Sequence, residues 1–553
     1  MSTLSALVAR RAALDYARRP LNLVLLVAVP IAIVVVWSGS LAQFSKIILG
    51  GKGDRGQIEA ATAGWAAAAL AGLAGFFQVI GARPADRRLS AAGGRTAAVV
   101  AGRLGASFGL AVVAATGGLV ALSARTGIDD PIRAMAGTVV IAVVYLSLGV
   151  LVGTFVRSEM NGALLVTLVW VFDVFFGPAL GPGSSVATRL FPMPYPTLVL
   201  MGQASGHAGP LGDVGWSLLW ALGLAVMASF RLWITTRPAP RPHSNLAVAT
   251  TDLSPVTSLA TPIAIPAAPL ATAEVVASAQ LAPVEPGSIT GRLVAVMRGG
   301  SREYRRNRVL WMLLVAVPAV FIGMAVMVTV DRPGPISLVD GGRRFVALLS
   351  ERRIHAATMV PIASAFLAGI TGLFVVTESA AGDRRLVLAG FRAREVLAGR
   401  LGVIGVATVI STAVAVTVSG MFYAPQQWVV FVGANLLIAL TYAVIGVLVG
   451  PLTGRLGGLY LILLLAFIDV GLGQSVMFPD GPPAWGAFLP ARGASRIMID
   501  GAFTGHFDQI RGLLLGLAWL GGLSAMAATV FQRRTGKAAP PRTFPQQDQR
   551  PAG

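Results

Sequence analysis

Long uncharged, apolar runs alternate with short arginine-rich segments along most of this chain. A run of about 20 apolar residues is long enough to cross a bilayer as an α-helix. The pattern therefore predicts an all-α polytopic membrane protein with about twelve transmembrane helices. The expected spans cover residues 21–42, 60–82, 104–124, 134–156, 160–188 and 214–230, and then 309–330, 356–377, 401–422, 428–450, 456–476 and 513–531.

The second six runs repeat the first six. The segment DRRLSAAGGRTAAVVAGRLG from Asp86 aligns without a gap with DRRLVLAGFRAREVLAGRLG from Asp383. LDYARRPLNLVLLVAVP around Tyr16 returns as REYRRNRVLWMLLVAVP around Tyr304. Because an internal copy in mid-chain cannot be a cleaved leader, each copy is expected to be an interfacial helix followed by a first span.

Between the two copies, residues 235–288 are rich in Pro, Ala, Thr and Val and nearly free of aromatic side chains. Such a segment buries too little apolar surface to offset chain entropy, so we expect a disordered linker. An even number of spans before the linker would insert both halves in the same orientation, as parallel repeats. The predicted organisation is a first six-span half at 1–234, the linker at 235–288, a second half at 289–531 and a disordered tail at 532–553.

Composition and charge agree with this picture. Of the 553 residues, 55% are hydrophobic and only 12% are charged, whereas soluble domains carry about 25% charged residues. Cytoplasmic loops of membrane proteins are enriched in Lys and Arg, which accounts for the net charge of +20 without nucleic acid. The same rule places both termini, the linker and both DRRL segments in the cytoplasm. Abundant Arg, Ala and Gly with little Lys hint at a bacterial protein, and hence at a bacterial plasma membrane.

Sites for nucleotides and metals are not expected on this chain. A phosphate-binding loop needs a glycine, four residues and then Gly-Lys-Ser/Thr, and neither Gly51-Lys52 nor Gly536-Lys537 has that context. There is no cysteine, which excludes disulfides and thiolate metal sites. We expect a protein that is not itself an enzyme and holds no cofactor.

The four histidines lack a second ligand at metal-binding spacing. They are His207, His243, His355 and His506. His207 and His506 are equivalent in the two repeats, each before a sixth span. Their side chains are expected to hydrogen-bond at an interface or a helix start, with a metal or proton role as the alternative.

Two acids lie inside apolar runs, at the same place in each half: Asp173 in LVWVFDVFFG and Asp469 in LLAFIDVGLG. A carboxylate in hydrocarbon costs a few kcal/mol or more, so each must face a cavity or a partner. They could face each other across a substrate or proton pathway, or each could hydrogen-bond a neighbouring helix and fix the packing. The sequence leaves both readings open.

The DRRL segments, read as short loops, also have two interpretations. A basic loop can anchor helix ends to anionic lipid. Lipid anchoring requires only charge, however, whereas here Leu, Ala-Gly, Arg and Ala-Gly-Arg-Leu keep a fixed spacing in both copies. Fixed spacing favours a small helix that docks in the groove of a partner protein.

At these segments the chain resembles the permease family of ATP-binding cassette type-2 transporters, in its fused-half form similar to tetronasin-type antibiotic exporters. That family's pattern of basic residues, a Leu-rich turn, Arg, Glu and Leu-x-Gly-Arg fits the second copy well, while Ala98 stands where Glu395 does and Gly81 where Glu378 does. The resemblance implies cytoplasmic coupling helices between the second and third spans. It also implies that the first half couples less tightly, or to a different face of the ATPase dimer. It implies that the following residues contact a partner ATPase and couple it to transport: Asp86, Arg87, Arg88, Arg95 and Arg103 in the first copy, and Glu378, Asp383, Arg384, Arg385, Arg392, Glu395 and Arg400 in the second.

The resulting hypothesis is the membrane subunit of an exporter for a hydrophobic drug, antibiotic or lipid-like molecule. Two copies of a separate cytoplasmic ATPase would bind ATP and Mg²⁺ and drive transport. The main alternative is a proton-coupled secondary exporter that uses Asp173 and Asp469. A third is a membrane scaffold or sensor without transport.

Overall fold

The computed structural model describes residues 3–46, 53–180, 190–238, 291, 296–298, 307–478 and 481–535. Among these residues, ten helices are long and apolar enough to cross a membrane. The fold is that of an all-α polytopic membrane protein with one added β-hairpin. Most of the expected linker and tail lies outside the described residues, but helices continue to Thr236 and to Thr535, slightly into both segments.

The first half begins with a helix at the position where the interfacial helix is expected. Ser5, Val8, Ala12 and Tyr16 form its buried face, and α1 packs on α5. The elements of this half are α1 (Thr3–Ala17), α2 (Pro20–Ala32), the π-helix η1 (Ile33–Trp37), α3 (Ser38–Phe44), α4 (Arg55–Ala91), α5 (Thr96–Thr126), α6 (Pro131–Phe155), α7 (Glu159–Phe175), α8 (Pro194–Met201) and α9 (Gly209–Thr236).

The second half follows a similar order of elements. Its counterpart of α1, expected around Tyr304, lies outside the described residues. The elements are α12 (Arg308–Val328), β1 (Pro333–Asp340), β2 (Arg343–Ser350), α13 (Glu351–Leu388), α14 (Ala393–Gly420), α15 (Trp428–Leu465), the π-helix η4 (Ala466–Gly473), the 3₁₀-helix η5 (Ala484–Phe488), α16 (Arg492–Phe503) and α17 (Ile510–Thr535).

The helix count differs from the expected twelve for two identifiable reasons. The expected span at 160–188 contains α7, whose 17 residues would rise only about 26 Å against a hydrocarbon core of about 30 Å. The expected spans at 428–450 and 456–476 belong to one run, Trp428–Gly473, of 46 residues. That run has room for two crossings, because the backbone leaves helical geometry at Gly454, where φ is +75°. The number of crossings stays a prediction.

Two long, deeply buried helices, α4 and α13, occupy the same position in the two sequence repeats and form the centre of the bundle. Glycines let α6 and α15 approach them closely. A Cβ on Gly149 would overlap the carbonyl oxygen of Gly72, and a Cβ on Gly446 would overlap that of Gly369. Small residues at such crossings are the usual means of close helix packing in membranes. The repeated GVLVG segments therefore serve this packing.

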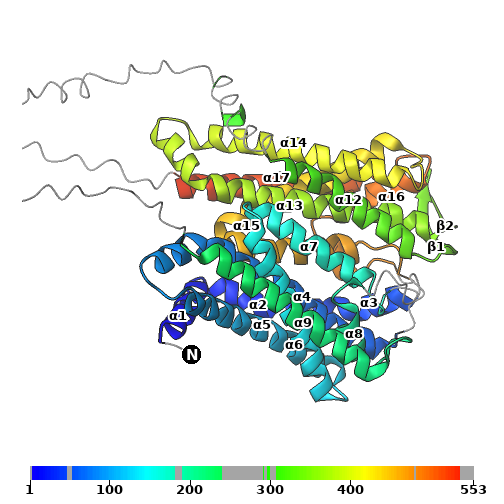
Figure 1. Ribbon diagram of the computed structural model, residues 1–553. Helices are drawn as coiled ribbons and strands as arrows, with labels where there is room; N and C mark the ends of the chain where they lie inside the picture. The colour runs from blue at the N-terminus through cyan, green and yellow to red at the C-terminus, as the bar shows by residue number, and fades with distance from the viewer. Residues whose placement is uncertain are drawn as a thin grey trace, which may run out of the picture.

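The halves meet along these central helices. Phe77 of α4 and Phe374 of α13, equivalent in the repeats, stack with ring centroids 6.4 Å apart and an interplanar angle of 4°. Tyr460 donates a hydrogen bond to the carbonyl oxygen of Leu70 at 3.1 Å. Figure 1 shows the first half below and the second above, with α7 and α15 between them.

The β-hairpin was not expected from the sequence. β1 and β2 pair antiparallel around Gly341 and Gly342, and both glycines have positive φ. Because α13 begins directly after β2 and carries its DRRL segment at the other end, the hairpin marks the opposite end of the bundle (Figure 1).

Candidate functional sites at the arginine-rich end and in the buried helices

The DRRL segments are helical, which corrects their reading as short loops. α4 continues as one helix to Ala91 and α13 to Leu388. Each turn contains a glycine with positive φ, Gly93 at +95° and Gly390 at +94°, before α5 or α14 begins. Because long helices form here, neither segment is a separate short coupling helix. We call residues 86–103 and 383–400 the arginine-rich end.

Four of the residues expected to contact a partner pair with each other. Arg103 donates to Asp86 from Nη2 at 2.7 Å and from Nε at 3.2 Å. Arg400 donates to Asp383 from Nη2 at 2.8 Å and from Nε at 3.0 Å. Both acids are buried, and each arginine side chain is 13% exposed. These ion pairs join the end of one helix to the start of the next in both halves, so their first role is structural.

Glu395 also has a local role. Its Oε2 accepts a hydrogen bond from the backbone N–H of Arg392 at 3.2 Å, and its side chain is buried. A glutamate three residues after the N-cap that bonds back in this way stabilises the start of its own helix. Ala98, its counterpart in the first half, has no side chain to do so. The difference between the copies is therefore, first, a difference in helix capping.

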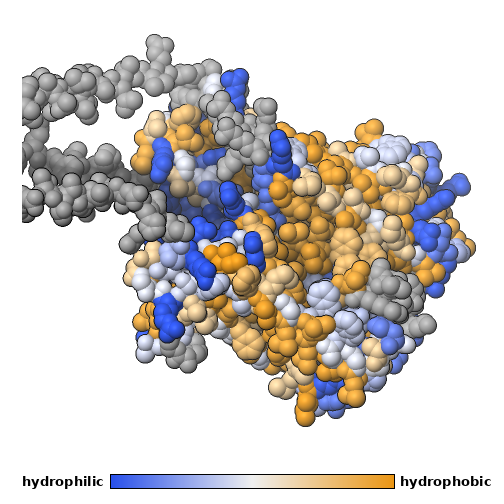
Figure 2. Space-filling model, in the orientation of Figure 1, coloured by the Kyte–Doolittle hydropathy of each residue, from blue (hydrophilic) through white to orange (hydrophobic). Residues whose placement is uncertain are grey.

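The other predicted contact residues remain at the surface. Exposed side chains belong to Arg87, Arg88, Arg95, Glu378, Arg384, Arg385 and Arg392, and the prediction had omitted the equally exposed Arg394. Arg87 donates to the carbonyl oxygen of Thr235, close to the end of α9, at 2.9 Å. Figure 2 shows hydrophilic residues gathered at this end around a recess, and apolar residues over the middle of the bundle.

A large cavity lies between the halves at the arginine-rich end. Its volume is about 790 Å³, and we call it the vestibule. Residues of both halves line it, including Arg19, Gln78, Phe77, Arg384 and Arg455. Arg455 forms an ion pair with Glu159 across the halves, so polar and charged groups surround much of the space.

The vestibule ends inside the bundle. Val376 of α13 lines it, whereas Ile362 lines a second cavity further along the same helix. The two residues are 14 positions apart, which corresponds to about 20 Å of helix. All residues from 363 to 375 are buried. A packed layer that contains the Phe77–Phe374 stack therefore separates the two cavities.

The two buried acids are hydrogen-bonded within their own halves. Asp173 accepts from Tyr145 Oη at 2.6 Å and from the backbone N–H of Met193 at 3.3 Å. Tyr145 lies on α6 and Asp173 on α7, so the first bond joins these two helices. The second bond joins α7 to the residue that precedes α8. This arrangement is the one expected if Asp173 hydrogen-bonds a neighbouring helix and fixes the packing.

Asp469 repeats this geometry and adds a donor. It accepts from Tyr442 Oη at 2.9 Å, from the backbone N–H of Ala491 at 2.9 Å and from Gln474 Nε2 at 3.1 Å. Neither acid lines the vestibule or the second cavity beyond the packed layer. The repeated Tyr145 and Tyr442 were visible in the sequence, but their pairing with the acids was missed.

His207 and His506 each form a side-chain contact near the start of a helix, α9 for His207 and α17 for His506. His207 Nε2 lies 3.4 Å from Tyr195 Oη. His506 Nδ1 lies 2.9 Å from Asp340 Oδ1 at the hairpin turn, and this hydrogen bond lowers the pKa of Asp340. Within the described ranges, no group of three His, Asp or Glu side chains could hold a metal ion. His243 lies outside them.

Compared with known proteins, the chain matches no family model and no curated sequence.

Proposed function

We propose that this chain is the membrane-spanning permease subunit of an ATP-binding cassette exporter. The observation that carries the proposal is the vestibule. It lies between two repeated halves, is large enough for a drug-sized molecule, and ends at a packed layer within the bundle. A protein that holds a path open at one end and closed further along has the form that alternating access requires.

In this proposal, the arginine-rich end faces the cytoplasm of a bacterial cell and contacts two copies of a separate ATPase. The exposed arginines of both copies provide a cationic surface that complements an acidic groove. ATP and Mg²⁺ would be held by the partner, and the chain itself would hydrolyse nothing. The apolar middle of the pathway favours a hydrophobic substrate.

The alternative, proton-coupled export through Asp173 and Asp469, has less support. A proton carrier must exchange protons with water in at least one state, whereas these carboxylates are fully buried and occupied by tyrosine and backbone donors. Asparagine at either position would turn an amide N–H₂ towards one of these donors. We expect Asp173→Asn and Asp469→Asn to reduce stability but to leave the energy source of transport unchanged.

Transport in inside-out vesicles tests the proposal. Vesicles would contain the chain and an ATPase subunit that copurifies with it, and the uptake of a hydrophobic fluorescent dye would be measured. ATP-driven uptake should stop with vanadate and persist when a protonophore collapses the proton gradient. Uptake that follows the gradient at constant ATP would favour the alternative, and no uptake under either condition would favour a scaffold or sensor.

A further inference from the structure

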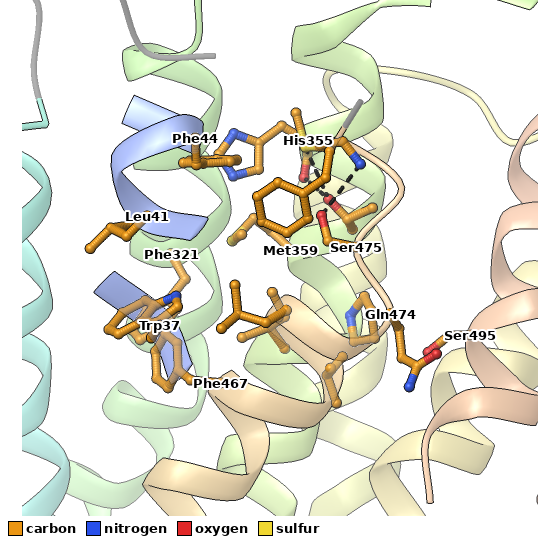
Figure 3. A pocket seen from close by; sticks show the side chains of 18 of the residues that line it. Trp37, Leu41, Phe44, Phe321, His355, Met359, Phe467, Gln474, Ser475 and Ser495 are labelled. Carbon is orange, nitrogen blue, oxygen red and sulfur yellow. Dashed lines mark hydrogen bonds between the residues drawn. The ribbon is translucent and has the colours of Figure 1, made fainter. Parts of the chain in front are cut away.

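The second cavity is lined mainly by apolar side chains. It lies between the halves, on the side of the packed layer away from the vestibule, and has a volume of about 60 Å³. Figure 3 shows aromatic side chains around it, including Trp37, Phe44, Phe321 and Phe467. Its walls come from η1, α3 and α7 of the first half and from α12, α13, η4 and α16 of the second.

Two polar atoms in this wall, His355 Nε2 and Ser495 Oγ, have no hydrogen-bond partner within the described residues. His355 is completely buried, and its Nε2 forms no hydrogen bond within the described residues. Figure 3 shows its ring next to Phe44 at one end of the cavity, with ring centroids 5.1 Å apart. A buried nitrogen without a partner is costly, since it has lost its bonds to water. This feature therefore requires an explanation.

The hydrogen bonds on the other side of the ring define what Nε2 can do. Thr329 Oγ1 donates its single proton to the carbonyl oxygen of Ala325 at 2.6 Å. The same Oγ1 lies 2.5 Å from His355 Nδ1. With the Thr329 proton on the Ala325 carbonyl, we assign the hydrogen of this contact to Nδ1, which donates it. In a neutral imidazole the other nitrogen is then an acceptor. Nε2 consequently requires a hydrogen-bond donor.

The remaining lining selects the kind of donor. No residue that lines the cavity is Asp, Glu, Lys or Arg, so a cation would enter without a compensating charge. Met324, Met359, Met477 and Met498 are four of the lining residues. Methionine adapts to ligands of different shape, which allows a cavity of this size to expand around a larger molecule.

We infer that this cavity is a binding site for a neutral, apolar molecule that carries one hydrogen-bond donor, such as a hydroxyl group, received by His355 Nε2. The inference rests on the proposed function, because it specifies the class of substrate that binds at a second site along the same transport pathway. The corresponding position in the first half is Ile58, so the histidine acceptor has no equivalent in that half.

Binding of two matched probes tests the inference. 2-Naphthol has the hydroxyl donor, and 2-methoxynaphthalene has the same rings without it. Equilibrium dialysis of the purified full-length chain in detergent, against protein-free micelles, should show 2-naphthol bound about tenfold more tightly. His355→Leu should abolish this preference while retaining binding of 2-methoxynaphthalene, which also shows that the variant is folded.

Three further variants separate a hydrogen bond from a packing effect. His355→Gln, which supplies a carbonyl acceptor, should restore part of the preference. Thr329→Val removes the acceptor that fixes the tautomer and should weaken the preference. His506→Gln, a histidine exposed outside the cavity, should leave it unchanged.

A preference that persists in His355→Leu would overturn the inference, as would failure of the wild-type chain to bind either probe. Because the assay needs neither ATPase nor transport, these outcomes are distinguishable from failure of the proposed function.

Discussion

Breaking the ion pair between Asp383 and Arg400 tests whether these two residues stabilise the fold, in contrast to the exposed arginines proposed to bind a partner. In Asp383→Asn the shape of the side chain is kept and its charge is lost, which leaves Arg400 only 13% exposed and without its acid. Breaking a buried pair by removing one partner costs about 3 to 5 kcal/mol. With an unfolding entropy of about 2.1 cal/mol/K per residue, such a loss lowers Tm by roughly 3 to 4 °C.

The assay is thermal unfolding in detergent followed by intrinsic tryptophan fluorescence, since the chain has 10 Trp and no Cys for thiol dyes. Asp86→Asn, which breaks the equivalent pair with Arg103, should give a similar decrease. The matched control is Arg385→Gln, two residues further along the same helix and exposed. Its effect should stay within about 0.5 kcal/mol. The doubly exchanged variant Asp383→Arg with Arg400→Asp should recover part of the lost stability.

If Asp383→Asn destabilises the chain no more than Arg385→Gln does, the structural assignment of the ion pair is wrong. The four paired residues would then return to the set that contacts a partner.

Three other consequences can be measured. Because Glu395 caps its own helix, reversing Arg384, Arg385 and Arg392 to Glu should reduce ATPase copurification about as strongly as reversing Arg87, Arg88 and Arg95; a loss confined to one half would contradict this. Gly446→Ala places a methyl group against the Gly369 carbonyl and should destabilise by about 1 to 3 kcal/mol, whereas Gly405→Ala, which meets no atom within 4 Å, should not destabilise; equal effects would exclude the close helix crossing. At the hairpin, the hydrogen bond from His506 lowers the pKa of Asp340. The contact therefore stabilises the fold above the ordinary carboxyl pKa of about 3.9, and this stabilisation is lost as pH falls through the lowered pKa. Between pH 2 and 6, Tm should decrease more steeply on acidification in the wild type than in Asp340→Asn, and parallel curves would argue against a stabilising contact.

Much of the fold could be predicted because its signals are local. Apolar runs located the helices, and the repeat showed that Asp86 and Asp383, or Asp173 and Asp469, occupy equivalent places. The pairing of Asp383 with Arg400 was also predictable in principle. The two residues lie at similar distances on either side of the turn at Gly390, and antiparallel helices bring such positions together.

Other features depend on contacts that a linear pattern does not contain. The hairpin had a signal in Asp340-Gly341-Gly342, a sequence typical of tight turns, but it was overlooked beside the stronger apolar runs. His355 had no copy in the first half to distinguish it. Its role depends on Thr329 and on a cavity wall assembled from seven elements of both halves, which only the three-dimensional arrangement reveals.

The central claim is that substrate passes between the halves through the layer that Phe77 and Phe374 close. The chain has no native cysteine, so Phe77→Cys with Phe374→Cys can be cross-linked without background by a reducible bifunctional thiol reagent. ATP-driven dye uptake into inside-out vesicles should stop on cross-linking and return after reduction, while each single variant transports under both conditions. Uptake that continues at full rate through the cross-linked protein would contradict a pathway at this layer.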